Sequence, residues 1–494
     1  MRFKDLTLGF ADARREYLNL KGLFFQKTFF DDRNVVPALL DDYFFIVCGS
    51  KGVGKTAVIS KLRSLGEDNP SLIVDAKDLS NFEYATFAKT KSDSETTGTQ
   101  KYKQSWDFLI YTSLLQLLVS STETSDLPQE FEKVAKFLSK IGVDIQGSTS
   151  RTINRNSLSL KNIKLGAASL VSLDIELEKE SGLTPYNYVD RISIINQILF
   201  DCISNFKLSD TKFFLTIDGL DDVLRLKKNQ TEIIASLIRS AASINDLFIE
   251  ANQQIKVILS AREDLMGTIN DPDLNKICQD GQLKINWSND TSGLKEILAR
   301  RFAYSGYSGS NSFDLWYQFF PKYFARKDSW DYLVERTLRK PRDVIQFMET
   351  CKRLYPDKCS LDRQQFKLAI KTYSSEYLIK EMENELSGFI EQKFITSIPT
   401  VFQSLGSNEF SNVTFHRIFS DMSIQGYTES ITNKILLLLY ERGYIGQIIT
   451  SGGKHGRSYT NVIFKNRNPD NPINYNKHFI IHKGILQGLG IHFD

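Results

Sequence analysis

At 494 residues the chain is too long for one ordinary hydrophobic core, and its length predicts about three domains. Its hydrophobic content of 41%, charged content of 24% and net charge of +3 are those of a globular protein and give no global electrostatic case for nucleic-acid binding. The five cysteines lack C-x-x-C spacing, which favours reduced thiols over a disulfide framework or a zinc site. With no apolar signal core and no apolar run of about 18 residues, we expect a cytoplasmic protein without a membrane partner.

The first 30 residues carry apolar and aromatic side chains between charges, which predicts helices packed on the domain that follows. From about 31 to 290, apolar strand-like runs alternate with helical patterns, as in an α/β fold with a parallel sheet and helices on both faces. The predicted strands are residues 43–48, 71–75, 213–218, 256–260 and 283–287.

The most specific feature of this region is a G-x-x-x-x-G-K-[ST] motif between the first predicted strand and a predicted helix. The motif consists of Gly49, Ser50, Lys51, Gly52, Val53, Gly54, Lys55 and Thr56, and Ala57 continues the helix. Such a loop turns backbone N–H groups towards the phosphates of a nucleotide, with the lysine on the β- and γ-phosphates and the hydroxyl on Mg²⁺. The alternative is an ordinary glycine-rich turn, which the strand and helix on either side disfavour.

A stretch between about 120 and 185 interrupts the alternation because it is rich in Ser, Thr and Asn. We interpret it as a polar insertion in the nucleotide domain that is partly mobile or rich in β-structure, and a surface elaboration is favoured over a dedicated site.

The third predicted strand ends at Asp218, at the edge where an open parallel sheet binds its ligand. Asp218 is therefore our candidate for Mg²⁺, acting mostly through water molecules, and Asp221 or Asp222 is the candidate that polarises the attacking water. The alternative is a solvated acidic turn after a core strand.

Arg262 ends the fourth predicted strand and is a candidate for contact with the γ-phosphate. A salt bridge of Arg262 to Glu263 or Asp264 is an equal alternative.

Residues 291–385 have helical periodicity and predict a helical lid. Arg342 opens one of these helices and could bind the phosphates from the lid; the alternative is an ordinary helix N-terminus with Asp343 in its first turn. Arg300 and Arg301 could act on a neighbouring subunit, but two arginines on an amphipathic helix are more often its solvated face.

Residues 386–494 form the predicted C-terminal domain, in which helices precede a β-hairpin in the order of a winged helix. The predicted helices are residues 389–405, 414–422 and 430–442, and the predicted strands are 444–449, 459–464, 479–482 and 485–489. Lys454 and Arg457 in the hairpin turn could contact a DNA backbone, but the excess of basic residues in this domain is small.

Together the motif at 49–56, the Asp218–Asp222 box and the end of the fourth strand resemble the signal-transducing (STAND) P-loop ATPases with a NACHT-type nucleotide domain. The Pro341–Arg342 pair and the C-terminal domain are similar to the lid and winged helix of those proteins and of the origin-recognition branch of AAA+ ATPases. The implied roles are phosphate binding by Gly49, Gly52, Gly54 and Lys55, Mg²⁺ binding by Thr56 and Asp218, catalysis by Asp221 or Asp222, and sensing by Arg262 and Arg342.

Two departures from the family pattern imply slow turnover. Gly219 stands where many hydrolytic relatives have a catalytic acid, and Asp222 replaces the usual glutamate. The absence of a guanine-reading N-K-x-D motif favours ATP and ADP as ligands.

The sequence thus predicts an ATP-binding and slowly hydrolysing switch, or an oligomerising regulator that acts with a protein partner or a second copy. By analogy alone we place it in bacterial antiviral defence or a similar stress response. The alternatives are a DNA-binding initiator or loader that uses the winged helix, and a scaffold that binds nucleotide without turnover; a kinase fits the lid and tail less well.

Overall fold

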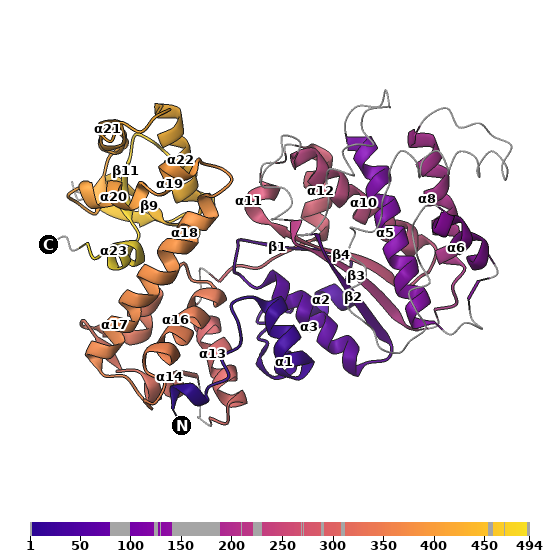
Figure 1. Cartoon of the computed structure of the whole chain (residues 1–494), viewed down its shortest axis with the longest axis horizontal. Coiled ribbons are helices and arrows are strands. Elements are labelled where there is room, and N and C mark those ends of the chain that lie inside the picture. The colour runs from indigo at the N-terminus through magenta and orange to yellow at the C-terminus, as the bar shows by residue number, and fades with distance from the viewer. Residues whose placement is uncertain are drawn as a thin grey trace. The chain divides into compact units, whose positions relative to one another are not determined.

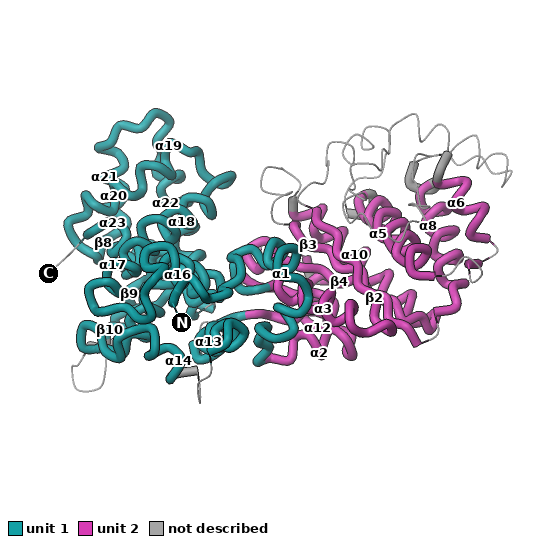
Figure 2. The backbone as a smooth tube through the Cα atoms, turned by 60° about the horizontal axis from the view of Figure 1, so that its bottom comes forward, with its two compact units in different colours: residues 1–32, 52–54, 286–494 teal, residues 33–51, 55–285 magenta. Residues whose placement is uncertain are grey.

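The computed structural model describes residues 2–79, 99–122, 127–128, 130–140, 188–208, 210–220, 230–267, 269, 271–287, 291–307, 312–452, 458–468 and 470–491. Figures 1 and 2 show that the chain forms two compact units, neither of which is a single continuous segment. Unit 1 comprises Met1–Asp32, Gly52–Gly54 and Asn286–Asp494, and unit 2 comprises Arg33–Lys51 and Lys55–Ile285.

The described part of unit 2 contains a five-stranded parallel sheet in the order β2-β3-β4-β1-β5. Its strands are β1 (Ile46–Gly49), β2 (Leu72–Asp78), β3 (Lys212–Asp218), β4 (Ile255–Arg262) and β5 (Gln282–Lys284). All four residues of β1 are buried, as are the five central residues of β3, which explains their nearly continuous apolar sequence. The five predicted strands are thus confirmed with shifted ends, and the last of them is three residues long.

Helices lie on both faces of this sheet. Figure 1 shows α2 (Val35–Asp41) and α3 (Lys55–Asp68) on one side, with α5 (Thr99–Ser121) and α10 (Gln230–Glu250) on the other. Unit 2 also contains α6 (Phe131–Lys140), α8 (Tyr188–Ser204), α11 (Glu263–Met266) and α12 (Pro272–Gly281). The fold is that of an α/β P-loop NTPase, as the sequence predicted.

The interpretation of residues 120–185 as a polar insertion is wrong for its first part. Phe131, Val134 and Leu138 recur along one face of α6 and are buried in the core of unit 2. Their spacing of three and four residues places them on one stripe of the helix, which explains the burial. The rest of the segment, from 141 to 185, lies outside the described residues.

Residues 1–32 belong to unit 1 and not to the phosphate-loop domain on which the sequence predicted them to pack. The buried ring of Phe3 lies 5.3 Å from that of Phe319, and the Phe3 N–H donates to the carbonyl of Lys358. After the short 3₁₀-helix η1 (Phe3–Asp5) comes α1 (Ala13–Thr28), whose Glu16 forms a buried ion pair with Arg301. Long-range packing, which local sequence does not encode, decides the placement of this segment.

The helical region that follows belongs to unit 1 and is rich in buried aromatic side chains such as Trp316 and Phe347. Its helices are α13 (Ser292–Tyr304), α14 (Ser312–Phe319), α15 (Ser329–Val334), α16 (Pro341–Leu354), α17 (Arg363–Tyr373), the π-helix η5 (Ser374–Leu378) and α18 (Ile379–Leu386). A two-stranded ribbon, β6 (Tyr323–Phe324) and β7 (Lys327–Asp328), lies between α14 and α15. The predicted helical character of this region is confirmed.

The remainder of unit 1 combines short helices with an antiparallel sheet, whose described strands have the order β10-β9-β11-β8. Its elements are α19 (Gln392–Ile395), α20 (Ile398–Ser404), β8 (Glu409–Phe410), α21 (Asn412–Asp421), α22 (Glu429–Glu441), β9 (Ile445–Gly452), β10 (Ser458–Ile463), β11 (His478–Ile481) and α23 (Lys483–Leu489).

Two predictions for this domain are corrected. The helix predicted at 389–405 is two short helices, and Pro399 lies in the first turn of the second. The strand predicted at 485–489 is the helix α23, which starts because the Nδ1 of His482 accepts the N–H of Gly484. No helix among the described residues is long and apolar enough to cross a membrane.

Candidate nucleotide-binding site

The predicted phosphate loop connects the end of β1 at Gly49 to the start of α3 at Lys55. Gly52 and Gly54 have φ angles of +85° and +107°, a left-handed region that glycine adopts without the strain of a Cβ atom. The loop leads into the N-terminus of a 14-residue helix, where the helix dipole favours an anion.

The side chain of Lys55 turns back over the first half of this loop. Its Nζ lies 3.1 Å from the carbonyl oxygens of both Gly49 and Ser50, and the residue is 7% exposed. A buried ammonium needs such acceptors, and these two carbonyls hold the charge close to the loop backbone. The role of this amine towards a phosphate stays a prediction.

Thr56 and Asp218 are brought together from different elements of unit 2. The Thr56 hydroxyl, in the first turn of α3, donates to Oδ2 of Asp218 at 2.7 Å. Asp218 ends β3, and β4 separates β3 from β1 in the sheet. A hydroxyl and a carboxylate oxygen are hard donors of the kind that Mg²⁺ takes together with waters and substrate phosphates, so this pair fits the ion.

The residues predicted to polarise water follow β3 in the sequence. The chain turns after β3 at Gly219, which has a φ angle of +80°. Asp221 and Asp222 lie outside the described residues, and their catalytic role stays a prediction. Among the residues that the structure describes, no group of three or more His, Cys, Asp or Glu side chains could hold a metal ion.

Arg262 forms the salt bridge that was the alternative to its role at the γ-phosphate. Its Nε and one terminal nitrogen donate to the two oxygens of Asp264, at 2.8 and 2.5 Å, and its side chain is 5% exposed. In the sheet, Arg262 pairs in register with Gly49, the first residue of the phosphate loop. The bidentate pair holds the guanidinium at the carboxyl end of β4.

The tip of the loop, Gly52–Gly54, belongs to unit 1, where other residues hold its carbonyl groups. The indole Nε1 of Trp287 donates to the carbonyl of Val53 at 2.9 Å, and the Arg342 N–H donates a long hydrogen bond of 3.5 Å to the carbonyl of Gly52. A methyl group on Gly52 would lie 3.4 Å from Cβ of Arg342. The sequence placed Trp287 at the end of the strand predicted at 283–287 and did not assign it a role at the loop; in the structure it lies three residues after β5.

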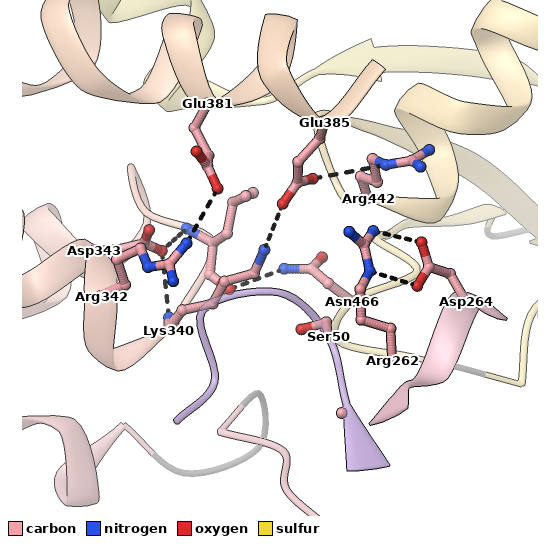
Figure 3. A network of polar contacts seen from close by, with 12 residues as sticks. Ser50, Arg262, Asp264, Lys340, Arg342, Asp343, Glu381, Glu385, Arg442 and Asn466 are labelled. Atoms are coloured by element: carbon pink, nitrogen blue, oxygen red, sulfur yellow. Dashed lines mark hydrogen bonds and ion pairs between the residues drawn. The ribbon is translucent and has the colours of Figure 1, made fainter. Parts of the chain in front are cut away.

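Arg342 lies at the start of α16 and has three partners within unit 1. Besides its N–H bond to Gly52, its Nε donates to the carbonyl of Ala11 at 3.2 Å, and one terminal nitrogen lies 3.6 Å from Glu381. Figure 3 shows this guanidinium directed towards the carboxylate of Glu381 on α18. The structure thus places Arg342 beside the loop tip, while its role towards phosphates stays a prediction.

Two further charged residues near Arg342 were not predicted as functional. The ammonium of Lys340 lies 3.5 Å from Glu385, and both side chains are buried. The carboxylate of Asp343 accepts the N–H groups of Leu338 and Lys340, and its burial raises its pKa to about 6 against the lowering effect of Lys340. The first turn of α16 is therefore fixed by buried charges and not by solvent-exposed ones.

The two arginines considered for action on a neighbouring subunit have partners in their own chain. Arg301 binds Glu16 with both terminal nitrogens, at 2.9 and 3.1 Å, and is 7% exposed. Arg300 donates to the carbonyl of Phe29 at 2.8 Å and to Glu296 at 3.1 Å. Arg301 is therefore a structural residue of unit 1, not the solvated helix face that the sequence favoured. Lys454 and Arg457 of the hairpin turn lie outside the described residues.

A family model matches part of unit 1. Residues 292–381, which run from α13 to the start of α18, match the model of the FunZ-associated C-terminal helical domain. No curated protein matches the chain.

The chain is also similar to two solved structures. The Orc1 protein of Aeropyrum pernix, in complex with DNA, is 12% identical with a TM-score of 0.36 over 93% of this chain and 90% of its own. Cdc6p from Pyrobaculum aerophilum is 12% identical with a TM-score of 0.28 over 95% of this chain and 97% of its own.

Proposed function

We propose that the protein binds Mg²⁺ and ATP at the phosphate loop, hydrolyses ATP slowly and uses the nucleotide as a conformational switch. The observation that carries the proposal is the hydrogen bond between Thr56 and Asp218, which joins the helix after the loop to the end of β3. A hydroxyl and a carboxylate meet there in the way that a Mg²⁺-nucleotide site requires, and Lys55 lies at the start of the same helix.

Each residue would have a distinct task. The N–H groups of the loop and the ammonium of Lys55 would bind the phosphates, and Thr56 with Asp218 would hold the metal, the latter through water. The metal would supply charge neutralisation at the β- and γ-phosphates. Asp221 or Asp222 would orient the attacking water by accepting its hydrogen bond, and an aspartate there, shorter than the usual glutamate, accounts for slow turnover.

The second candidate function is ATP-dependent DNA binding by an initiator or loader. It is favoured by the order of elements in the C-terminal domain, where α20, α21 and α22 precede the antiparallel pair β9 and β10, as in a winged helix. DNA binding that weakens with salt and is lost in a Lys454→Ala and Arg457→Ala variant would support this candidate. The proposal of antiviral defence rests on the family resemblance alone, and a phage-challenge assay of expressing cells would test it.

Nucleotide binding and hydrolysis test the main proposal. We expect wild type to bind Mg²⁺-ATP in preference to Mg²⁺-GTP and to hydrolyse ATP with release of phosphate. In Lys55→Ala, the affinity for Mg²⁺-ATP and the rate of hydrolysis should each fall by about 100-fold or more. Lys61→Ala, on the same helix outside the loop, is the matched control and should retain both. If wild type and Asp222→Asn bind ATP equally and neither hydrolyses it, the protein is instead a nucleotide-bound scaffold.

A further inference from the structure

Two basic residues on either side of Pro341 lie close to the tip of the phosphate loop. A methyl group on Gly52 would lie 3.4 Å from Cβ of Arg342 and 3.5 Å from Cδ of Lys340. Both residues sit at the start of α16, and all three belong to unit 1. A methyl group added at the loop tip would thus meet two cationic side chains.

The charged ends of these side chains reach one helix, α18. Arg342 lies 3.6 Å from Glu381 and Lys340 lies 3.5 Å from Glu385 (Figure 3). Glu381 and Glu385 are four residues apart and therefore share a face of α18. Both cationic side chains near the loop tip therefore pair with the same face of α18.

Glu385 also reaches the C-terminal domain. Its second oxygen lies 3.8 Å from Nε of Arg442, the residue that follows α22. The exposed fractions of the side chains are 2% for Glu385, 8% for Lys340 and 7% for Arg442. One buried carboxylate is therefore shared by a cation at the loop tip and a cation of the C-terminal domain.

Such sharing makes the two contacts interdependent. In a buried site, removal of one charged partner leaves the others uncompensated, because little water is present to replace it. A phosphate anion at the loop would attract Lys340 and Arg342 and weaken their pairing with α18. The Glu385 carboxylate would then be balanced chiefly by Arg442, which strengthens the contact between α18 and the end of α22.

We propose that Glu381 and Glu385 form a carboxylate relay that couples nucleotide at the phosphate loop to the C-terminal domain. They are positioning residues: they pair with the charged ends of Arg342 and Lys340, and Glu385 conveys a change in this pairing to Arg442. The relay rests on the proposed nucleotide function. Because coupling is reciprocal, a ligand of the C-terminal domain would alter ATP affinity by the same factor as ATP alters the affinity for that ligand.

Hydrogen exchange tests the relay, with Glu385→Gln compared with Glu383→Gln. The control carries the same substitution on the same helix, and Glu383 pairs with Lys380, which is largely exposed. In wild type and Glu383→Gln we expect Mg²⁺-ATP to slow amide exchange in peptides that cover α22. In Glu385→Gln the response should disappear, and the ratio of ATP to ADP affinity should change about fivefold or more.

The outcomes separate the relay from the nucleotide function. The relay alone would be overturned if a folded Glu385→Gln protein kept the wild-type ratio of ATP to ADP affinity and the wild-type change in amide exchange of α22. It would also be overturned if wild type bound ATP without any change in the amide exchange of α22. A wild type that binds no nucleotide would overturn both proposals. Arg442→Gln interrupts the same path from the C-terminal domain and replaces Glu385→Gln if that variant does not fold.

Discussion

The base and the tip of the phosphate loop are held by different kinds of contact. At the base, Lys55 and Thr56 use an ammonium and a hydroxyl to bind loop carbonyls and Asp218. At the tip, the carbonyls of Gly52 and Val53 accept N–H groups of Arg342 and Trp287. The base side chains can exchange these partners for phosphate and metal, whereas a carbonyl oxygen has no attraction for an anion.

This difference assigns separate tasks to the two parts. Contacts at the base should break and re-form with each nucleotide, and contacts at the tip should persist through binding. Variants of the base should therefore change ligand dependence, whereas variants near the tip should change stability and affinity together. Four predictions test this division.

The largest effect is expected at Asp343, which fixes the segment that contacts the tip. Burial raises its pKa from 3.8 to about 6, so its contribution to stability is complete below pH 3.8 and is lost as pH rises through 6. Between pH 4 and 7 the free energy of unfolding of wild type should fall by about 2 kcal/mol relative to Asp343→Asn, as measured by urea unfolding at each pH.

Glu335→Gln supplies a control with the opposite sign. Burial raises the pKa of Glu335, but hydrogen bonds from Lys327 and Lys483 outweigh it and lower the value overall. Wild type should therefore lose stability relative to this variant as pH falls. A difference between wild type and Asp343→Asn that is independent of pH would contradict the assignment of a buried, titrating Asp343.

The second effect concerns Asp218 at the base. Asp218→Asn should reduce the affinity for Mg²⁺-ATP by about 10- to 100-fold, because a residue that holds the metal through water contributes on that scale. Binding of ATP in the presence of EDTA should change little. Titration calorimetry with and without metal measures both, with the exposed Asp201→Asn as control. An equal loss under the two conditions would remove Asp218 from the metal site.

The third effect concerns Trp287 at the tip. Trp287→Phe leaves the Val53 carbonyl without the indole donor and should cost about 1–2 kcal/mol of stability, with an affinity for Mg²⁺-ATP that is about fivefold weaker. Trp106→Phe is the matched control, since Trp106 also donates to a carbonyl, that of Ile233, at 3.2 Å. Both variants should lose stability, but only Trp287→Phe should lose affinity. Equal ATP affinities would show that the indole does not support the loop.

The smallest effect is expected for a methyl group at Gly52. Gly52→Ala places a Cβ on a residue with a φ angle of +85°, at a cost of about 1 kcal/mol. Gly406→Ala is the control, with a φ angle of +70° and open space around the added methyl group. Thermal unfolding should show similar losses for both, whereas weaker nucleotide binding should occur in Gly52→Ala alone. Wild-type affinity in Gly52→Ala would show that the loop tip tolerates change.

The sequence predicted the parts of the site whose signals are local. The motif between a buried strand and a helix located Lys55 and Thr56, and the apolar run before Asp218 identified the strand that carries it. Both depend on short-range patterns: continuous apolar residues in a buried parallel strand, and glycines where φ is positive.

The contacts at the tip could not be predicted in this way because they join distant parts of the chain. Trp287 and Val53 are 234 residues apart, and Arg342 and Ala11 are 331 apart. The Lys340–Glu385–Arg442 cluster has no sequence signature, since each charge alone is typical of a solvated helix face. Packing in three dimensions buries them, and the same effect groups residues 1–32 with unit 1.

The inclusion of Gly52–Gly54 in unit 1 has a practical consequence for dissecting the protein into fragments. A recombinant fragment that stops before residue 286 would contain the complete G-x-x-x-x-G-K-[ST] motif. It would lack Trp287, whose indole donates a hydrogen bond to the carbonyl of Val53 in that motif. Failure of such a truncated protein to bind ATP would say little about the motif itself. Biochemical work on this ATP site is therefore better done with point variants in the intact polypeptide.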